Sequence, residues 1–199
     1  MNANEVERMT DREGVLIILR QHVKGESLFR HALTVEAVMH YFARLYNEDE
    51  DQWGIVGLLH DIDFELYPEQ HCHMVRALLV PHGVPEEMLR AIESHGYGIV
   101  NDVEPLHVME KVLYATDELT GLIAATALMR PSRSVLDLET ASVKKKWKQK
   151  GFAAGVDRAL IEQGATMLDM DVDTLINHTI QAMRVAAEAI GLQGEPQQS

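Results

Sequence analysis

The sequence has very little cysteine and no long apolar run, and each absence excludes a class of protein. Cys72 is the single cysteine among 199 residues, so neither an internal disulfide framework nor a cysteine-rich zinc module can be built. Any bound metal must therefore be held by imidazole and carboxylate ligands. No apolar stretch is long enough to cross a bilayer, and no secretory signal opens the chain. We therefore expect a soluble, cytoplasmic protein.

Positive charge is also scarce. The chain has 18 lysines and arginines against 31 aspartates and glutamates, which gives a formal net charge of −13. This charge opposes binding to phosphate backbones, so nucleic acid is not an expected partner. A lysine-rich stretch over 144–150, around Trp147, is the local exception. It is either a solvated helix face or a site for a small phosphorylated ligand.

Hydrophobic spacing predicts an all-α fold, because apolar residues recur three and four positions apart along most of the chain. With 46% hydrophobic residues, the chain can bury one sizeable core. Thr10 and Glu13 predict a capping box for a first helix that ends near His22. Later helices are expected over 28–45, up to the residues 60–61, from Pro68 through His71 and His73 to Pro81, from Pro85 to 94, after Pro105, and near 135–148, 153–167 and 172–191.

The most informative feature is the doublet His60-Asp61, which ends the apolar run 55–59. A buried imidazole or carboxylate needs a partner to offset its loss of hydration, and a metal ion is the simplest partner for both. His31 lies on the apolar stripe of an earlier helix, and Asp117 lies in the middle of a later one. Together these residues form a mixed nitrogen and oxygen ligand set that suits Mn²⁺, Fe²⁺, Co²⁺, Ni²⁺, Zn²⁺ or Mg²⁺.

A histidine, a His-Asp doublet and a distant aspartate in an all-helical chain resemble the HD superfamily of metal-dependent phosphohydrolases. His31 matches the first histidine of that pattern, His60-Asp61 the doublet, and Asp117 the closing aspartate. The resemblance covers residues from about 27 to 125, roughly half of the chain. It implies that these four residues bind a divalent metal within an HD-domain-like helical bundle, which a C-terminal helical extension follows.

The resemblance also raises the question of a second metal ion. Members of the superfamily that bind two metals have two further histidines between the doublet and the last aspartate, and His71 and His95 stand in those places, with His73 as a competitor for His71. One ion is expected, and a second is the alternative. Residues 61–63 read Asp-Ile-Asp, where many two-metal members have Asp-Ile-Gly-Lys. This chain lacks the lysine of that motif, so we expect no function that depends on it.

The activity that the resemblance implies is hydrolysis of a small phosphorylated molecule, a phosphomonoester or phosphodiester, with a nucleotide as the expected substrate. Asp61 is the expected catalytic residue, because it can ligate the metal and orient the attacking water. A nearby acidic side chain is needed to transfer protons, and the candidates are Asp63, Glu65 and Glu118. The candidate partners of the substrate phosphate are Arg76, Arg130, Arg133 and Lys145, and because none is favoured the substrate-binding residues are unassigned.

Two other functions stay open at this stage. A diiron oxygenase can use the same scaffold, with His71 and His95 completing six ligands for a redox-active metal pair. A regulatory module can bind a nucleotide at the same place without turning it over. Oxygen consumption by the iron-loaded protein distinguishes the first of these from a hydrolase, and binding without product formation distinguishes the second.

The expected organisation is a single body with helical additions at both ends. We expect an N-terminal helix over 1–26, the HD-type metal-binding domain over 27–130, C-terminal helices over 131–191 that pack on the same domain, and a disordered tail over 192–199. The apolar faces of the C-terminal helices leave room for a homodimer contact.

Overall fold

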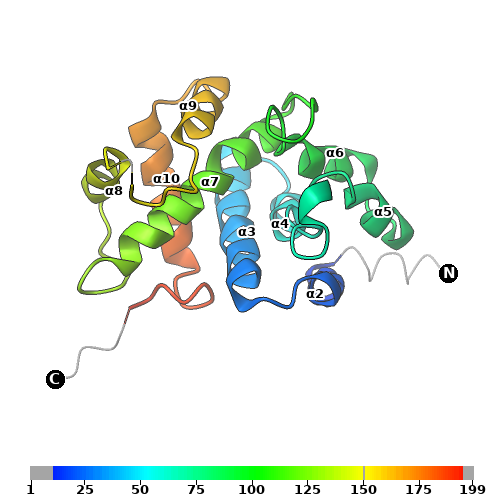
Figure 1. Ribbon diagram of the computed structural model, residues 1–199, viewed down its shortest axis with the longest axis horizontal. Helices are drawn as coiled ribbons and strands as arrows, with labels where there is room; N and C mark the ends of the chain where they lie inside the picture. The colour runs from blue at the N-terminus through cyan, green and yellow to red at the C-terminus, as the bar shows by residue number, and fades with distance from the viewer. Residues whose placement is uncertain (1–10, 150, 195–199) are drawn as a thin grey trace.

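The fold is all α-helical, as the spacing of apolar residues predicts. The computed structural model describes residues 11–149 and 151–194, and within these ranges it contains nine α-helices, two short 3₁₀ helices and no strand (Figure 1). The elements in chain order are α2 (Arg12–His22), α3 (Glu26–Tyr46), α4 (Glu50–Leu59), η1 (Pro68–Gln70), α5 (Val75–Leu79), η2 (Val80–His82), α6 (Glu86–Ser94), α7 (Val108–Leu128), α8 (Thr140–Trp147), α9 (Arg158–Met167) and α10 (Val172–Val185).

Helix α3 stands in the middle of the molecule, with α2, α4, α5 and α6 on one side of it and α8, α9 and α10 on the other (Figure 1). Its most extensive contacts are with α4. Gly57 allows the two helices to approach closely, because a Cβ atom there would lie 2.9 Å from the backbone of Glu36. This approach brings the end of α4, where His60 is the C-cap, alongside the first turns of α3, which carry His31.

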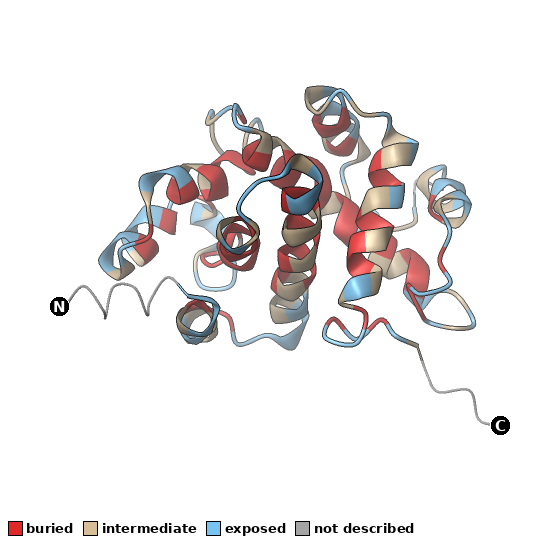
Figure 2. Cartoon of the chain, turned by 180° about the vertical axis from the view of Figure 1, so that it is seen from behind, coloured by how far each residue is buried: buried red, intermediate tan, exposed pale blue. Residues whose placement is uncertain are grey.

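Helix α7 runs across α3 and connects the two sides of the molecule (Figure 1). The buried positions of α3, α4 and α7 face one another and form the centre of the core (Figure 2). On the other side α9 crosses α7 at very short range, since a Cβ atom on Gly164 would lie 2.5 Å from the Cα atom of Ala115. These contacts hold the middle of α7, including Asp117, above the adjacent ends of α3 and α4.

Two helix starts differ from the sequence-based expectation. The N-cap of α2 is Asp11, whose side chain accepts a hydrogen bond from the backbone N–H of Gly14, and Thr10 lies outside the described residues. The prediction of one helix from Pro68 to Pro81 is wrong, because the segment is divided into the 3₁₀ helix η1, the short helix α5 and the start of the 3₁₀ helix η2. Between η1 and α5, Cys72 has a φ of 64°, a left-handed conformation that stops helix propagation and leaves His71 and His73 in a turn.

The C-terminal helices are shorter than expected, and α9 and α10 both contact α7. The tail was expected to be disordered from residue 192, but Leu192 is buried and accepts hydrogen bonds from Ser134 Oγ and from the backbone N–H of Val135. The rest of that tail, 195–199, lies outside the described residues. Among the helices that the structure describes, none combines the length and apolar character that a membrane span requires.

Candidate metal centre

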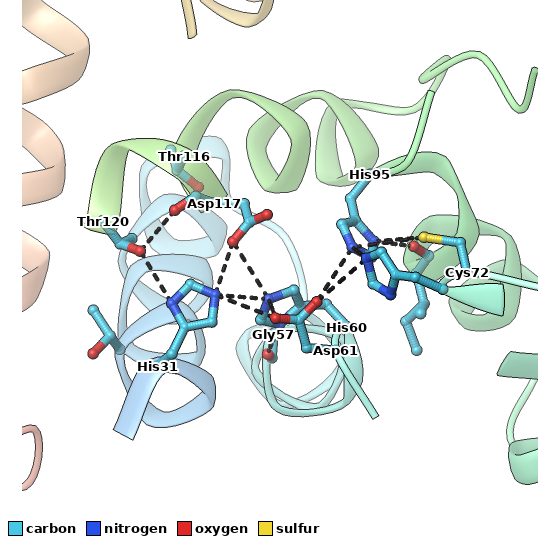
Figure 3. A network of polar contacts seen from close by, with 12 residues as sticks. His31, Gly57, His60, Asp61, Cys72, His95, Thr116, Asp117 and Thr120 are labelled. Carbon is cyan, nitrogen blue, oxygen red and sulfur yellow. Dashed lines mark hydrogen bonds and ion pairs between the residues drawn. The ribbon is translucent and has the colours of Figure 1, made fainter. Parts of the chain in front are cut away.

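The four residues singled out by their pattern in the sequence converge at the junction of α3, α4 and α7 (Figure 3). The Nε2 atoms of His31 and His60 lie 3.0 Å apart. Asp117 Oδ1 lies 2.9 Å from the Nε2 atom of His31 and 3.4 Å from that of His60. Asp61 Oδ2 lies 3.6 and 3.4 Å from the same two nitrogens. Two imidazole nitrogens and two carboxylate oxygens therefore surround one point.

Both imidazoles are oriented by hydrogen bonds from their other ring nitrogen. His60 Nδ1 donates to the backbone oxygen of Gly57 at 2.8 Å, and a carbonyl oxygen can only accept, so the proton is on Nδ1. The hydroxyl of Thr120 donates to the backbone oxygen of Asp117 and is left to accept from His31 Nδ1, at a longer 3.5 Å. In the neutral form of both rings, the two Nε2 lone pairs then point at each other. This arrangement is repulsive unless a proton or a metal ion lies between the two nitrogens, and a metal ion fits that place.

The electrostatics of this group also call for a positive charge. Burial lowers the pKa of His60, but the carboxylates of Asp61 and Asp117 outweigh it and raise that pKa to about 10. Burial raises the pKa values of the two carboxyl groups, but the facing imidazoles hold both well below the ordinary range. Both carboxylates are therefore ionised, and their two negative charges are offset either by a protonated His60 or by a divalent cation that takes the place of the proton.

A second group of side chains adjoins the first. The Nε2 atoms of His71 and His95 lie 3.1 Å apart, and each lies 3.6 Å from Asp61 Oδ1. The second oxygen of the same carboxylate, Oδ2, faces His31 and His60. Asp61 thus joins the two groups, one oxygen toward each (Figure 3).

The imidazoles of the second group are oriented in the same way as those of the first. His95 Nδ1 donates to the backbone oxygen of Ile92, and His71 Nδ1 donates to Asp63 Oδ1 at 2.8 Å. Burial lowers the pKa of His71, but the hydrogen bond with Asp63 raises it to about 9. Their Nε2 atoms and Asp61 Oδ1 make a second set of potential ligand atoms, which fits a metal ion that displaces the protons of the two rings. His73 is not part of it, because its Nε2 atom donates to the backbone oxygen of Val100.

Asp63 has a role that the sequence did not identify. Its side chain is fully buried, and besides accepting from His71 it accepts from the backbone N–H of Met74 at 3.2 Å. Both carboxylate oxygens are therefore engaged, and these contacts favour a role for Asp63 in positioning His71 over the proton-transfer role considered from the sequence. The only sequence signal for this was the acidic residue at the place where many two-metal members have glycine.

Cys72 also lies beside the second group. Its Sγ atom is 3.7 Å from His95 Nε2, and it forms with His71 and His95 a cluster of potential ligand atoms. Burial raises the pKa of the thiol, but the imidazole of His95 lowers it to about 7. The inference that a single cysteine leaves only nitrogen and oxygen ligands therefore missed this residue, because cysteine counting says nothing of a lone thiol that the fold places beside two imidazoles.

The other side chains considered for proton transfer and phosphate binding are mostly occupied elsewhere. Glu65 accepts from the backbone N–H groups of Lys24 and Gly25 ahead of α3. Glu118 lines a cavity of about 300 Å³ that residues of both groups also line. Burial and the charge of the neighbouring Asp117 raise the pKa of Glu118 to about 7. None of the four side chains considered for phosphate binding lines this cavity: Arg76, Arg130, Arg133 and Lys145. Arg76 is paired with Glu86 and Glu93, and Arg130 is paired with Asp137.

Comparison with known proteins identifies one family. The family model of the HD domain matches residues 28–122, from the first turn of α3 into α7, and this range contains all six histidine and aspartate residues of the two groups. The chain matches no curated protein and no solved structure.

Proposed function

Since the chain carries an HD domain over residues 28–122, a domain of metal-dependent phosphohydrolases, we propose that it hydrolyses a small phosphorylated molecule at two metal ions. His31, His60, Asp61 and Asp117 would hold the first ion, and Asp61, His71 and His95 the second. The observation that carries the proposal is the position of Asp61, whose two oxygens face two separate pairs of oriented imidazoles.

Divalent ions at this centre would supply Lewis-acid activation of a water molecule and of a phosphoryl oxygen. The residues of the chain provide the rest. The hydrogen bonds of the four Nδ1 atoms set the ring orientations before anything binds, so no reorganisation is needed during the reaction. Glu118 lines the cavity directly over the ligands, and with a pKa of about 7 its carboxyl group can take up or release a proton near neutral pH.

Metal removal and replacement test this function. We expect the chelated protein to release no phosphate from a panel of phosphomonoesters and phosphodiesters, including the nucleotides expected from the sequence. Reloading with Mn²⁺, Fe²⁺, Co²⁺, Ni²⁺, Zn²⁺ or Mg²⁺, one at a time, is expected to restore phosphate release with at least one ion. Saturable nucleotide binding without product would instead identify a regulatory module, and oxygen consumption by the iron-loaded protein would identify an oxygenase.

Asp63→Asn tests the orientation of the second group. Asparagine keeps the shape of the side chain, but it loses the charge and can no longer accept from both His71 and Met74 with two oxygens. We expect the affinity of the second ion to fall about 10- to 100-fold while the first is retained, measured by metal titration calorimetry. Asp102→Asn, the same change at an exposed position, is the matched control. Equal affinities in the two variants would contradict the positioning role.

A further inference from the structure

A large cleft opens beside the proposed metal centre and has no assigned occupant. It has a volume of about 940 Å³ and lies between the start of α3, the second half of α7 and the turn at 190–192. His31, Phe64 and Gly121 line both this cleft and the smaller cavity over the ligands. The cleft therefore adjoins the place where a phosphate group would be held, and it is the space into which the rest of the substrate would extend.

The walls of the cleft are largely apolar and partly open to solvent. Leu28, Ala124, Leu128 and Ile190 contribute side chains from three separate segments. Phe64, at the junction of the two cavities, is 47% exposed, and Leu128 is 44% exposed. Exposed apolar side chains that gather around a cleft usually mark the binding site of an apolar group, since a protein gains no stability from leaving them in water.

Cations are few in the same region. Among the described residues, Arg30 is the single arginine that lines either cavity, and no lysine lines them. The lysine-rich helix α8 contributes nothing to the walls, and Lys144 is paired with Asp173. A ligand with several phosphates needs several cationic or donor groups beyond the metal ions. The walls therefore suit a ligand with a single phosphate.

From these observations we propose that the cleft binds the organic group of the substrate, and that the substrate class is the phosphate monoester of an apolar alcohol. The proposal rests on the hydrolase function proposed above and narrows it. The phosphate would lie at the six ligand residues, and the alkyl or aryl group would pass Phe64 and Gly121 into the cleft.

Gly121 offers a way to fill the cleft without disturbing the fold. A Cβ atom at this position would have no neighbour closer than 3.8 Å, and the residue lies inside helix α7, where replacing glycine is stabilising. Gly121→Leu therefore places an apolar side chain at the junction of the two cavities. Ala141→Leu, at an exposed position of α8 that lines neither cavity, adds apolar volume to a helix surface and is the control.

The experiment uses the metal-loaded protein and alkylphosphonates from methyl to hexyl, which bind as phosphate esters do but have no bond to hydrolyse. We expect calorimetry to show affinity rising about two- to fourfold for each added methylene, the gain expected for burying it. In Gly121→Leu this dependence on chain length is expected to disappear, and in Ala141→Leu it should match the unaltered protein.

Three results would overturn the proposal: no binding of any alkylphosphonate, affinity that does not change with chain length, or an equal chain-length dependence in Gly121→Leu. Hydrolysis is measured separately on alkyl phosphates and on a nucleoside monophosphate. Chain-length-dependent binding without any hydrolysis would support the cleft and contradict the hydrolase function. A nucleoside monophosphate turned over with a higher kcat/KM than hexyl phosphate would contradict the apolar substrate class while supporting the hydrolase.

Discussion

Replacing Asp61 with alanine is expected to leave the protein without bound metal and to lower kcat/KM by about a thousandfold or more, equivalent to about 4 kcal/mol. The reason is that Asp61 serves both groups of ligands. Its Oδ2 atom lies 3.4 Å from His60 Nε2, and its Oδ1 atom lies 3.6 Å from both His71 and His95. Without this carboxylate, Asp117 is the only remaining carboxylate among the six proposed ligand residues, so neither group keeps its ligand set.

Elemental analysis of the purified variant and steady-state phosphate release together check this expectation. Asp51→Ala is the matched control, since it removes an exposed aspartate from the first turn of the same helix, α4. It should keep the metal content and the activity of the unaltered protein. Full metal content or undiminished turnover in Asp61→Ala would show that the centre described here is not the site of the reaction.

The second large effect is expected for His71→Ala. We expect the metal content to fall from two ions to one per chain, and kcat to fall about a hundredfold or more, equivalent to about 2.7 kcal/mol. His71 contributes one of the two imidazoles of the second group, and its hydrogen bond with the buried Asp63 keeps it aimed at Asp61. Without it, the second ion keeps His95 and one oxygen of Asp61, with the Cys72 thiol beside them, and loses one of its two imidazoles.

The neighbouring histidine provides the control for this variant. His73→Ala removes an exposed imidazole that donates to the backbone oxygen of Val100 and faces neither group of ligands. It should keep both ions and most of the activity. If His71→Ala instead turns over substrate normally with a single bound ion, the protein works with one metal, and the second group has another role.

The order of the candidate ligand residues and the positions of the long helices could be predicted, because both are visible in the local sequence. Apolar spacing along 28–45 is visible in the sequence, and the long helix α3 was found there. The order histidine, His-Asp doublet, aspartate resembled the HD pattern, and residues 28–122 match the HD domain. Local signals failed where tertiary contacts decide the backbone, as in the turn at His71–Met74, which the buried carboxylate of Asp63 holds by two hydrogen bonds.

The sequence by itself determined the helical class and which residue types were available to bind a metal, because helix periodicity and the chemistry of side chains are properties of short segments. Only the tertiary structure decided that His71 rather than His73 faces Asp61, that Asp63 accepts a hydrogen bond from His71, and that Cys72 lies beside His95. It also decided that a largely apolar cleft adjoins the proposed metal ligands. These outcomes depend on how closely helices approach one another, as at Gly57 against α3, and spacing along the chain carries no information about that.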